Sequence, residues 1–81
     1  MSIFYNISYM EKKELCKIIG KNIQKERANK GLTQETFAEL MNVSWSYVSK
    51  IESGIINLSL GKILQIANYL EIDIEKLLKI K

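Results

Sequence analysis

The sequence predicts an all-α domain of five helices, and three observations lead to that prediction. The chain contains no proline and only four glycines, so few residues force the backbone to turn. Between these glycines the apolar residues recur at the three- and four-residue spacing that is typical of helices. With 81 residues, the chain is long enough for one small hydrophobic core and too short for two domains.

The first helix is expected to begin near Tyr9 and to end at Gly31. Ser8 and Glu11 have the Ser-x-x-Glu spacing of a capping box, and Gly31 suits the left-handed residue that follows a helix. Residues 1–8 then form an N-terminal arm, either a strand or a loose segment, ahead of a domain that spans 9–81. A helical wheel separates an apolar side from a lysine side: Leu15, Ile18, Ile19 and Ile23 against Lys13, Lys17, Lys21 and Lys25.

Four further helices follow, each preceded by a residue that commonly caps a helix N-terminus. These caps are Thr33, Ser44, Ser59 and Asp73. Gln34 and Glu35 occupy the first turn of the second helix, and Gly54 ends the third. The inward-facing residues expected of the last two helices are Leu60, Ile63, Leu64, Ala67 and Leu70, then Ile74, Leu77 and Leu78.

Residues 33–53, TQETFAELMNVSWSYVSKIES, have the pattern of a helix-turn-helix. Small Ala38 lets the two helices approach closely, and Asn42 tolerates the left-handed backbone that the turn requires. Val43 then points back into the core. The remaining packing positions are Val48 and Ile51, with Phe37, Leu40 and Met41 beneath them.

At these residues the chain resembles the Cro and phage-repressor family of bacterial regulators, also called the XRE family. The resemblance covers roughly residues 17–79, including IGKNIQKERANKGLTQ, VSWSYVSKIESG and NLSLGKILQIANYLEIDIEKLL. It implies a five-helix, phage-repressor-like DNA-binding domain whose members commonly bind operator DNA as homodimers. It also implies an ion pair between Arg27 and Glu52, which spacing alone would not have revealed.

The outward side of the third helix is the expected contact with double-stranded DNA. Trp45, Ser46, Ser49 and Lys50 are the candidate base-reading residues, since the N-terminal turn enters the major groove deepest. Trp45 stands where the family often has glutamine or arginine, and two roles stay open: it covers a thymine methyl or a sugar, or it packs sideways on the protein. The candidate phosphate ligands are Gln34, Ser44, Tyr47, Ser53 and Asn57.

Composition excludes most other chemistry. The chain has no histidine and a single cysteine, Cys16, so Ser-His and Cys-His nucleophiles, the usual zinc sites and an intrachain disulfide are all impossible. We expect no enzyme activity, no cofactor, no metal and no small-molecule ligand. No apolar run approaches the roughly 20 residues of a membrane span, and no signal peptide is apparent, so a cytoplasmic location is expected.

The charge distribution is weakly consistent with a polyanionic partner. The net charge is +3, and the basic excess lies in residues 1–31. Most of the lysine stripe on the first helix is expected to be a solvated face.

The function expected from the sequence is that of a sequence-specific transcriptional regulator that binds a palindromic operator as a homodimer. A restriction–modification controller and a phage-type repressor both fit this size. Near the C-terminus, four apolar residues either form the dimer interface or merely complete the core: Ile72, Ile74, Leu78 and Ile80. The alternative function is an antitoxin or another protein-interaction module that uses the same fold.

Overall fold

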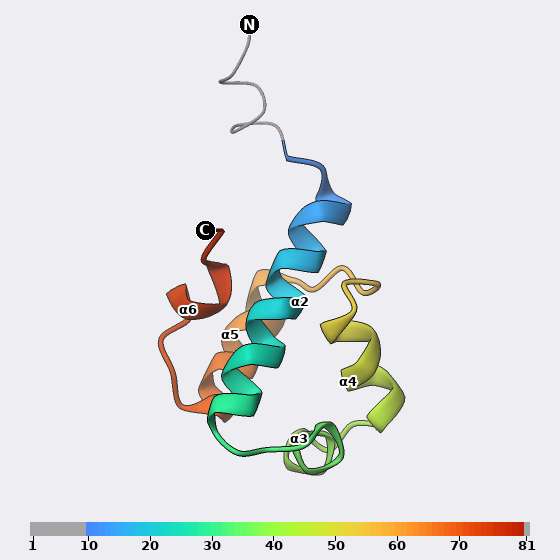
Figure 1. The fold of residues 1–81 in the computed structure, drawn as a ribbon, viewed down its shortest axis with the longest axis vertical. Coiled ribbons are helices and arrows are strands. Elements are labelled where there is room, and N and C mark those ends of the chain that lie inside the picture. The colour runs from blue at the N-terminus through green and yellow to red at the C-terminus, as the bar shows by residue number, and fades with distance from the viewer. Residues whose placement is uncertain (1–9, 81) are drawn as a thin grey trace, which may run out of the picture.

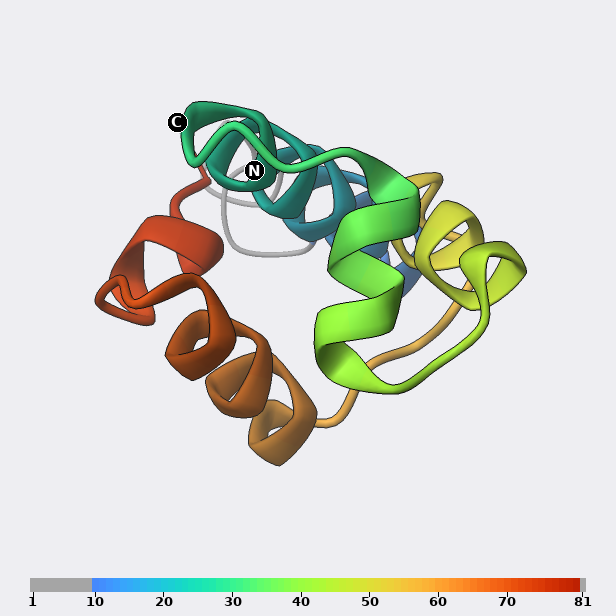
Figure 2. The ribbon, with the colours of Figure 1, turned by 90° about the horizontal axis from the view of Figure 1, so that it is seen from below.

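The computed structural model describes residues 10–80. Every regular element in that range is a helix, which confirms the predicted fold class. The helices are α2 (Lys12–Asn29), α3 (Gln34–Met41), α4 (Trp45–Glu52), α5 (Leu60–Leu70) and α6 (Glu75–Leu78). The long helix α2 runs through the middle of the domain and contacts α4, α5 and α6 (Figure 1). Helices α4 and α6 lie on opposite sides of it, as both views show (Figures 1 and 2).

Three of the predicted N-caps hold their helices as the sequence indicated. The hydroxyls of Thr33, Ser44 and Ser59 each accept a hydrogen bond from the backbone N–H three residues later. Such a bond satisfies one of the backbone donors that the first helical turn leaves without a partner.

The first and last predicted helix starts were wrong. Helix α2 begins at Lys12, not near Tyr9, and its N-cap is Glu11, whose backbone N–H donates to the Glu14 carboxylate over 3.4 Å. The expected cap Ser8 lies outside the described residues. Helix α6 begins at Glu75, and Asp73 contributes its backbone carbonyl to Lys76 N–H rather than a side-chain cap.

Four helices end in the same way, with a left-handed residue followed by an apolar one. At each end, two backbone N–H groups bond back to carbonyls of the last turn, which is the Schellman arrangement. The left-handed residues have φ between 58° and 80°: Gly31, Asn42, Gly54 and Glu71. The sequence predicted the first three, whereas glutamate at the fourth gives no comparable local signal.

The core lies between α2 and the other helices. Its fully buried large side chains are Ile23, Phe37, Val48, Ile51, Ile66, Leu70 and Leu77. The prediction that three leucines would be buried was wrong: Leu40 is 49 % exposed, Leu60 67 % and Leu64 48 %. Each lies at the flank of its helix's apolar stripe, where no neighbouring helix reaches far enough to cover it.

Candidate nucleic-acid interface

The turn between α3 and α4 holds the two helices closely together. Asn42 adopts the left-handed conformation (φ 58°, ψ 46°), and Val43 N–H donates to Ala38 O over 2.9 Å. Ala38 is buried at the crossing, and Val43 packs against the core from its edge. The small residue, the left-handed asparagine and the valine therefore lie where the sequence pattern placed them.

Helix α4 has one buried side and one exposed side. Val48 and Ile51 are buried, and Tyr47 is half-buried against the same core. The outward side carries the predicted base-reading residues: Trp45, Ser46 and Lys50 are exposed, and Ser49 is half-buried. Helix α4 therefore presents a continuous polar and aromatic surface to solvent.

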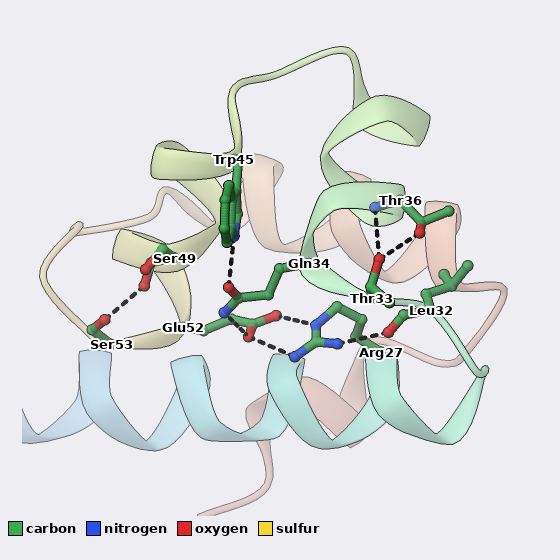
Figure 3. Close-up of polar contacts among 9 residues, drawn as sticks. All are labelled: Arg27, Leu32, Thr33, Gln34, Thr36, Trp45, Ser49, Glu52 and Ser53. Carbon is green, nitrogen blue, oxygen red and sulfur yellow. Dashed lines mark hydrogen bonds and ion pairs between the residues drawn. The ribbon is translucent and has the colours of Figure 1, made fainter.

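A chain of hydrogen bonds links the start of α4 to the middle of the domain (Figure 3). The Trp45 indole Nε1–H donates to Gln34 Oε1 over 2.9 Å, and Gln34 Nε2 donates to Glu52 Oε1 over 2.9 Å. Because an indole only donates and a carboxylate only accepts, the orientation of the Gln34 amide follows from its two partners. Gln34 thereby connects α3 to both ends of α4.

Glu52 forms a buried ion pair with Arg27 of α2, the pair that the family resemblance implied. Arg27 Nε and Nη2 donate to the two Glu52 carboxylate oxygens over 2.7 and 3.0 Å, and Arg27 Nη1 donates to Leu32 O over 2.6 Å. This bidentate geometry is the strongest form of arginine–carboxylate contact. The pair ties the C-terminal end of α4 to α2 and to the segment that enters α3.

The predicted phosphate ligands differ in how free their polar groups are. The Ser44 hydroxyl oxygen accepts from Tyr47 N–H, which leaves its own hydrogen available to a phosphate. The Ser53 hydroxyl donates to Ser49 O over 2.6 Å, so this hydrogen is already engaged. Asn57 lies exposed in the loop before α5, where its side-chain oxygen is 3.8 Å from Cys16 Sγ.

Two glycines, neither of them in the predicted site, bring the end of α4 onto α2. A Cβ added at Gly20 would lie 2.5 Å from Ile51 O, and one added at Gly54 would lie 2.7 Å from Lys17 Cα. The backbones therefore touch at both points, and a side chain at either would push α4 away. The signal in the sequence was Gly20 itself, since a lone glycine inside a helical pattern often marks close packing.

The predicted dimer residues belong to α6 and the segments next to it, and α6 lies on the opposite side of α2 from α4. Ile72, Ile74 and Leu78 pack partly against the core, whereas Ile80 is 49 % exposed. Leu78 also lines a hollow of about 220 Å³ whose walls are mainly apolar. The other walls of this hollow include Leu15, Cys16, Ile56, Leu58, Leu60 and Ile63.

Two features are absent from residues 10–80. No three Cys, Asp or Glu side chains between residues 10 and 80 come together in a way that could hold a metal ion. In the same range, none of the helices combines the length and the apolar character needed to span a bilayer.

Comparisons with known proteins agree on this architecture. Residues 23–77 match the family model described as HTH_3, helix-turn-helix. No curated protein sequence matches the chain.

Several solved structures are similar to the chain. The restriction-modification controller protein C.AhdI from Aeromonas hydrophila is 39 % identical with a TM-score of 0.69, over 76 % of this chain and 94 % of that one. A hypothetical transcription factor, NHTF from Neisseria, is 28 % identical with a TM-score of 0.74, over 86 % and 80 % of the two chains.

The third is the clp gene regulator ClgR from C. glutamicum, which is 28 % identical with a TM-score of 0.74, over 79 % of this chain and 82 % of that one. The family model covers more than half of the chain, and the 39 % identity with a controller protein extends over three quarters of it. The chain therefore belongs to the Cro and phage-repressor family of helix-turn-helix proteins, the XRE family.

Proposed function

We propose that this protein is a sequence-specific transcriptional regulator that binds a palindromic operator as a homodimer. The observation that carries the proposal is the exposed side of α4, which is held in place by the buried Arg27–Glu52 pair and by Gln34. A helix that is fixed on one side and exposed on the other is suited to enter a major groove. The similarity to C.AhdI favours a restriction–modification controller over a phage-type repressor.

In this proposal Ser46, Ser49 and Lys50 read base edges. A serine hydroxyl donates or accepts, and a lysine commonly donates to guanine O6 and N7. The backbone phosphates lie against the helix N-termini, where free N–H groups and the positive end of the helix dipole favour an anion. Glu52 takes one of the two amide hydrogens of Gln34, so the second remains for a phosphate oxygen.

The remaining phosphate contacts come from Ser44 and Asn57, with the Tyr47 hydroxyl reaching a phosphate from its half-buried ring. Ser53 can donate to a phosphate only after its hydroxyl breaks its hydrogen bond to the Ser49 carbonyl. We therefore assign Ser53 the smallest contribution to phosphate binding. None of these phosphate ligands is a cation. The fall in affinity with rising salt should therefore be shallow for a DNA-binding protein, because each phosphate neutralised by Lys or Arg adds to that slope.

The homodimer supplies the specificity that one helix lacks, because a single recognition helix reads only a few base pairs. Ile72, Ile74, Leu78 and Ile80, which lie in α6 and the segments next to it, form the proposed dimer interface. Helix α6 lies on the opposite side of α2 from α4 (Figures 1 and 2). The hollow beside Leu78, with exposed Leu60 at its wall, extends the apolar surface that a second copy would cover.

Fluorescence anisotropy tests the DNA-binding function. Labelled duplex from upstream of the protein's own gene should bind more tightly than random duplex at moderate salt. Ser49→Glu should abolish this binding and leave the thermal midpoint nearly unchanged, because a carboxylate on the outward side repels phosphates. Asn68→Glu adds the same charge to an exposed position of α5 and should bind normally. Equal affinity for both duplexes would contradict the proposal.

Light scattering tests the dimer separately. Ile80→Lys should shift the protein towards monomer, whereas Leu40→Lys should not, although both side chains are 49 % exposed. A wild-type protein that stays monomeric at high concentration would argue against the interface. Copurification with an unrelated small protein, without DNA preference, would favour the antitoxin function instead.

A further inference from the structure

Trp45, at the start of α4, combines exposure to solvent with a fixed polar contact. Its side chain is 56 % exposed, and its single polar atom is already bonded to Gln34. The bond is not an isolated surface contact, because Gln34 is itself held by the buried carboxylate of Glu52 (Figure 3). The ring therefore has one edge fixed by Gln34, while more than half of the residue is open to solvent.

The fixed edge determines what the ring can recognise. An indole has one donor, Nε1–H, and no acceptor, so the bond to Gln34 leaves Trp45 without a hydrogen bond to offer a base. The glutamine or arginine that often occupies this position in the family makes bidentate hydrogen bonds, and Trp45 cannot replace them. What it offers a major groove is apolar surface alone.

Only one common base presents an apolar group in the major groove. Thymine carries a C5-methyl group there, while guanine, adenine and cytosine present donors and acceptors. A 5-methylcytosine carries the same methyl group at the same ring position. The chemistry that fits the open part of the Trp45 ring is therefore a pyrimidine with a methyl group on C5.

We propose that Trp45 is a specificity-determining residue that selects a C5-methyl pyrimidine, in ordinary DNA a thymine, at one position of each operator half-site. This inference rests on the proposed DNA-binding function and adds to it a defined base preference. Gln34 is the positioning residue. Because it accepts the hydrogen bond of the indole N–H, that N–H cannot donate to a base, and the ring is held in one orientation.

The test replaces thymine by deoxyuridine, which lacks only the methyl group. An operator selected from a random duplex pool is resynthesised with deoxyuridine at one symmetric pair of positions at a time, and anisotropy measures each affinity. At one symmetric pair of positions, wild-type affinity should fall. Each of the two half-sites should contribute a loss of roughly four-fold, the effect expected for losing one buried methyl group. A 5-methylcytosine–guanine pair at that position should bind better than an unmethylated cytosine–guanine pair.

Two variants assign the effect to Trp45. Trp45→Ala should bind the thymine and deoxyuridine operators equally at that position, whereas Tyr69→Ala, which removes an exposed aromatic ring from α5, should keep the wild-type difference. The inference is overturned if no deoxyuridine substitution weakens wild-type binding, or if Trp45→Ala shows the same loss as the wild type.

A second measurement needs no variant. Trp45 is the only tryptophan in the chain, so intrinsic emission reports on it directly. Emission should shift to shorter wavelength on the thymine operator, and less so when deoxyuridine occupies the contacted position. Tight binding with unchanged emission would refute the role of Trp45 and leave the DNA-binding function intact, whereas absence of binding to every duplex would refute that function itself.

Discussion

Replacing Arg27 with methionine tests how the buried ion pair holds α4 on the domain. The substitution keeps an aliphatic side chain of similar reach and removes three hydrogen bonds, two to Glu52 and one to Leu32 O. Glu52 is only 6 % exposed, so its carboxylate would stay buried without a counter-charge, with Gln34 as its remaining donor. The cost of Arg27→Met therefore comes mainly from the orphaned charge.

The expected magnitude follows from the burial of both partners. Removing one member of a buried pair typically lowers the free energy of unfolding by about 3–5 kcal/mol. For a domain of this size each kcal/mol lowers the thermal midpoint by about 4–8 °C, so Arg27→Met should lower it by at least about 12 °C. Circular dichroism during heating measures this midpoint.

Two comparisons separate the orphaned charge from lost packing. Lys25→Met alters an exposed position of the same helix and should change the free energy of unfolding by less than about 0.5 kcal/mol. Arg27→Met combined with Glu52→Leu should be more stable than Arg27→Met alone, because the second substitution removes the unpaired carboxylate. A midpoint drop below about 4 °C for Arg27→Met, or a double variant less stable than the single one, would refute the reasoning.

Substitutions at three further positions probe other contacts, and urea denaturation measures each. Gly20→Ala places a Cβ 2.5 Å from Ile51 O and should lower the free energy of unfolding by about 1–3 kcal/mol, so an unchanged urea midpoint would contradict the close helix contact. Asn22→Ala removes two hydrogen bonds, of 2.9 and 2.8 Å, to carbonyls at the end of α6 and should cost about 1–3 kcal/mol. Thr33→Ala removes the cap of α3 and should cost about 1 kcal/mol, while Thr33→Ser should restore it.

Prediction from the sequence succeeded where the physical cause is local. Thr33, Ser44 and Ser59 cap helices because a hydroxyl reaches a backbone N–H three residues away, whatever the rest of the fold does. Asn42 and Gly31 end helices because of their own backbone preferences. The helix-turn-helix could be located for the same reason.

Prediction was less accurate where a neighbouring helix decides the outcome. The helical spacing of residues 60–70 predicted the apolar side of α5 correctly. It also predicted that Leu60 and Leu64 would be buried, although both lie at the edge of that apolar side and are exposed. The predicted inward-facing residues of α5 did not include Ile66, which is fully buried. Amphipathic spacing shows where an apolar stripe begins, whereas the reach of adjacent helices determines how wide the buried part is.

The sequence by itself determined the class of fold, the position of the helix-turn-helix and the outward side of α4, because caps, turn residues and helical spacing act over a few residues. Only the tertiary structure decided what the outward residues are free to do. Gln34, Trp45 and Glu52 are separated by 7 to 18 positions in the chain, and packing of α3 against α4 joins them in one chain of hydrogen bonds. That packing engages the indole N–H of Trp45 in a bond to Gln34 and leaves more than half of the residue exposed, a property that no local pattern encodes.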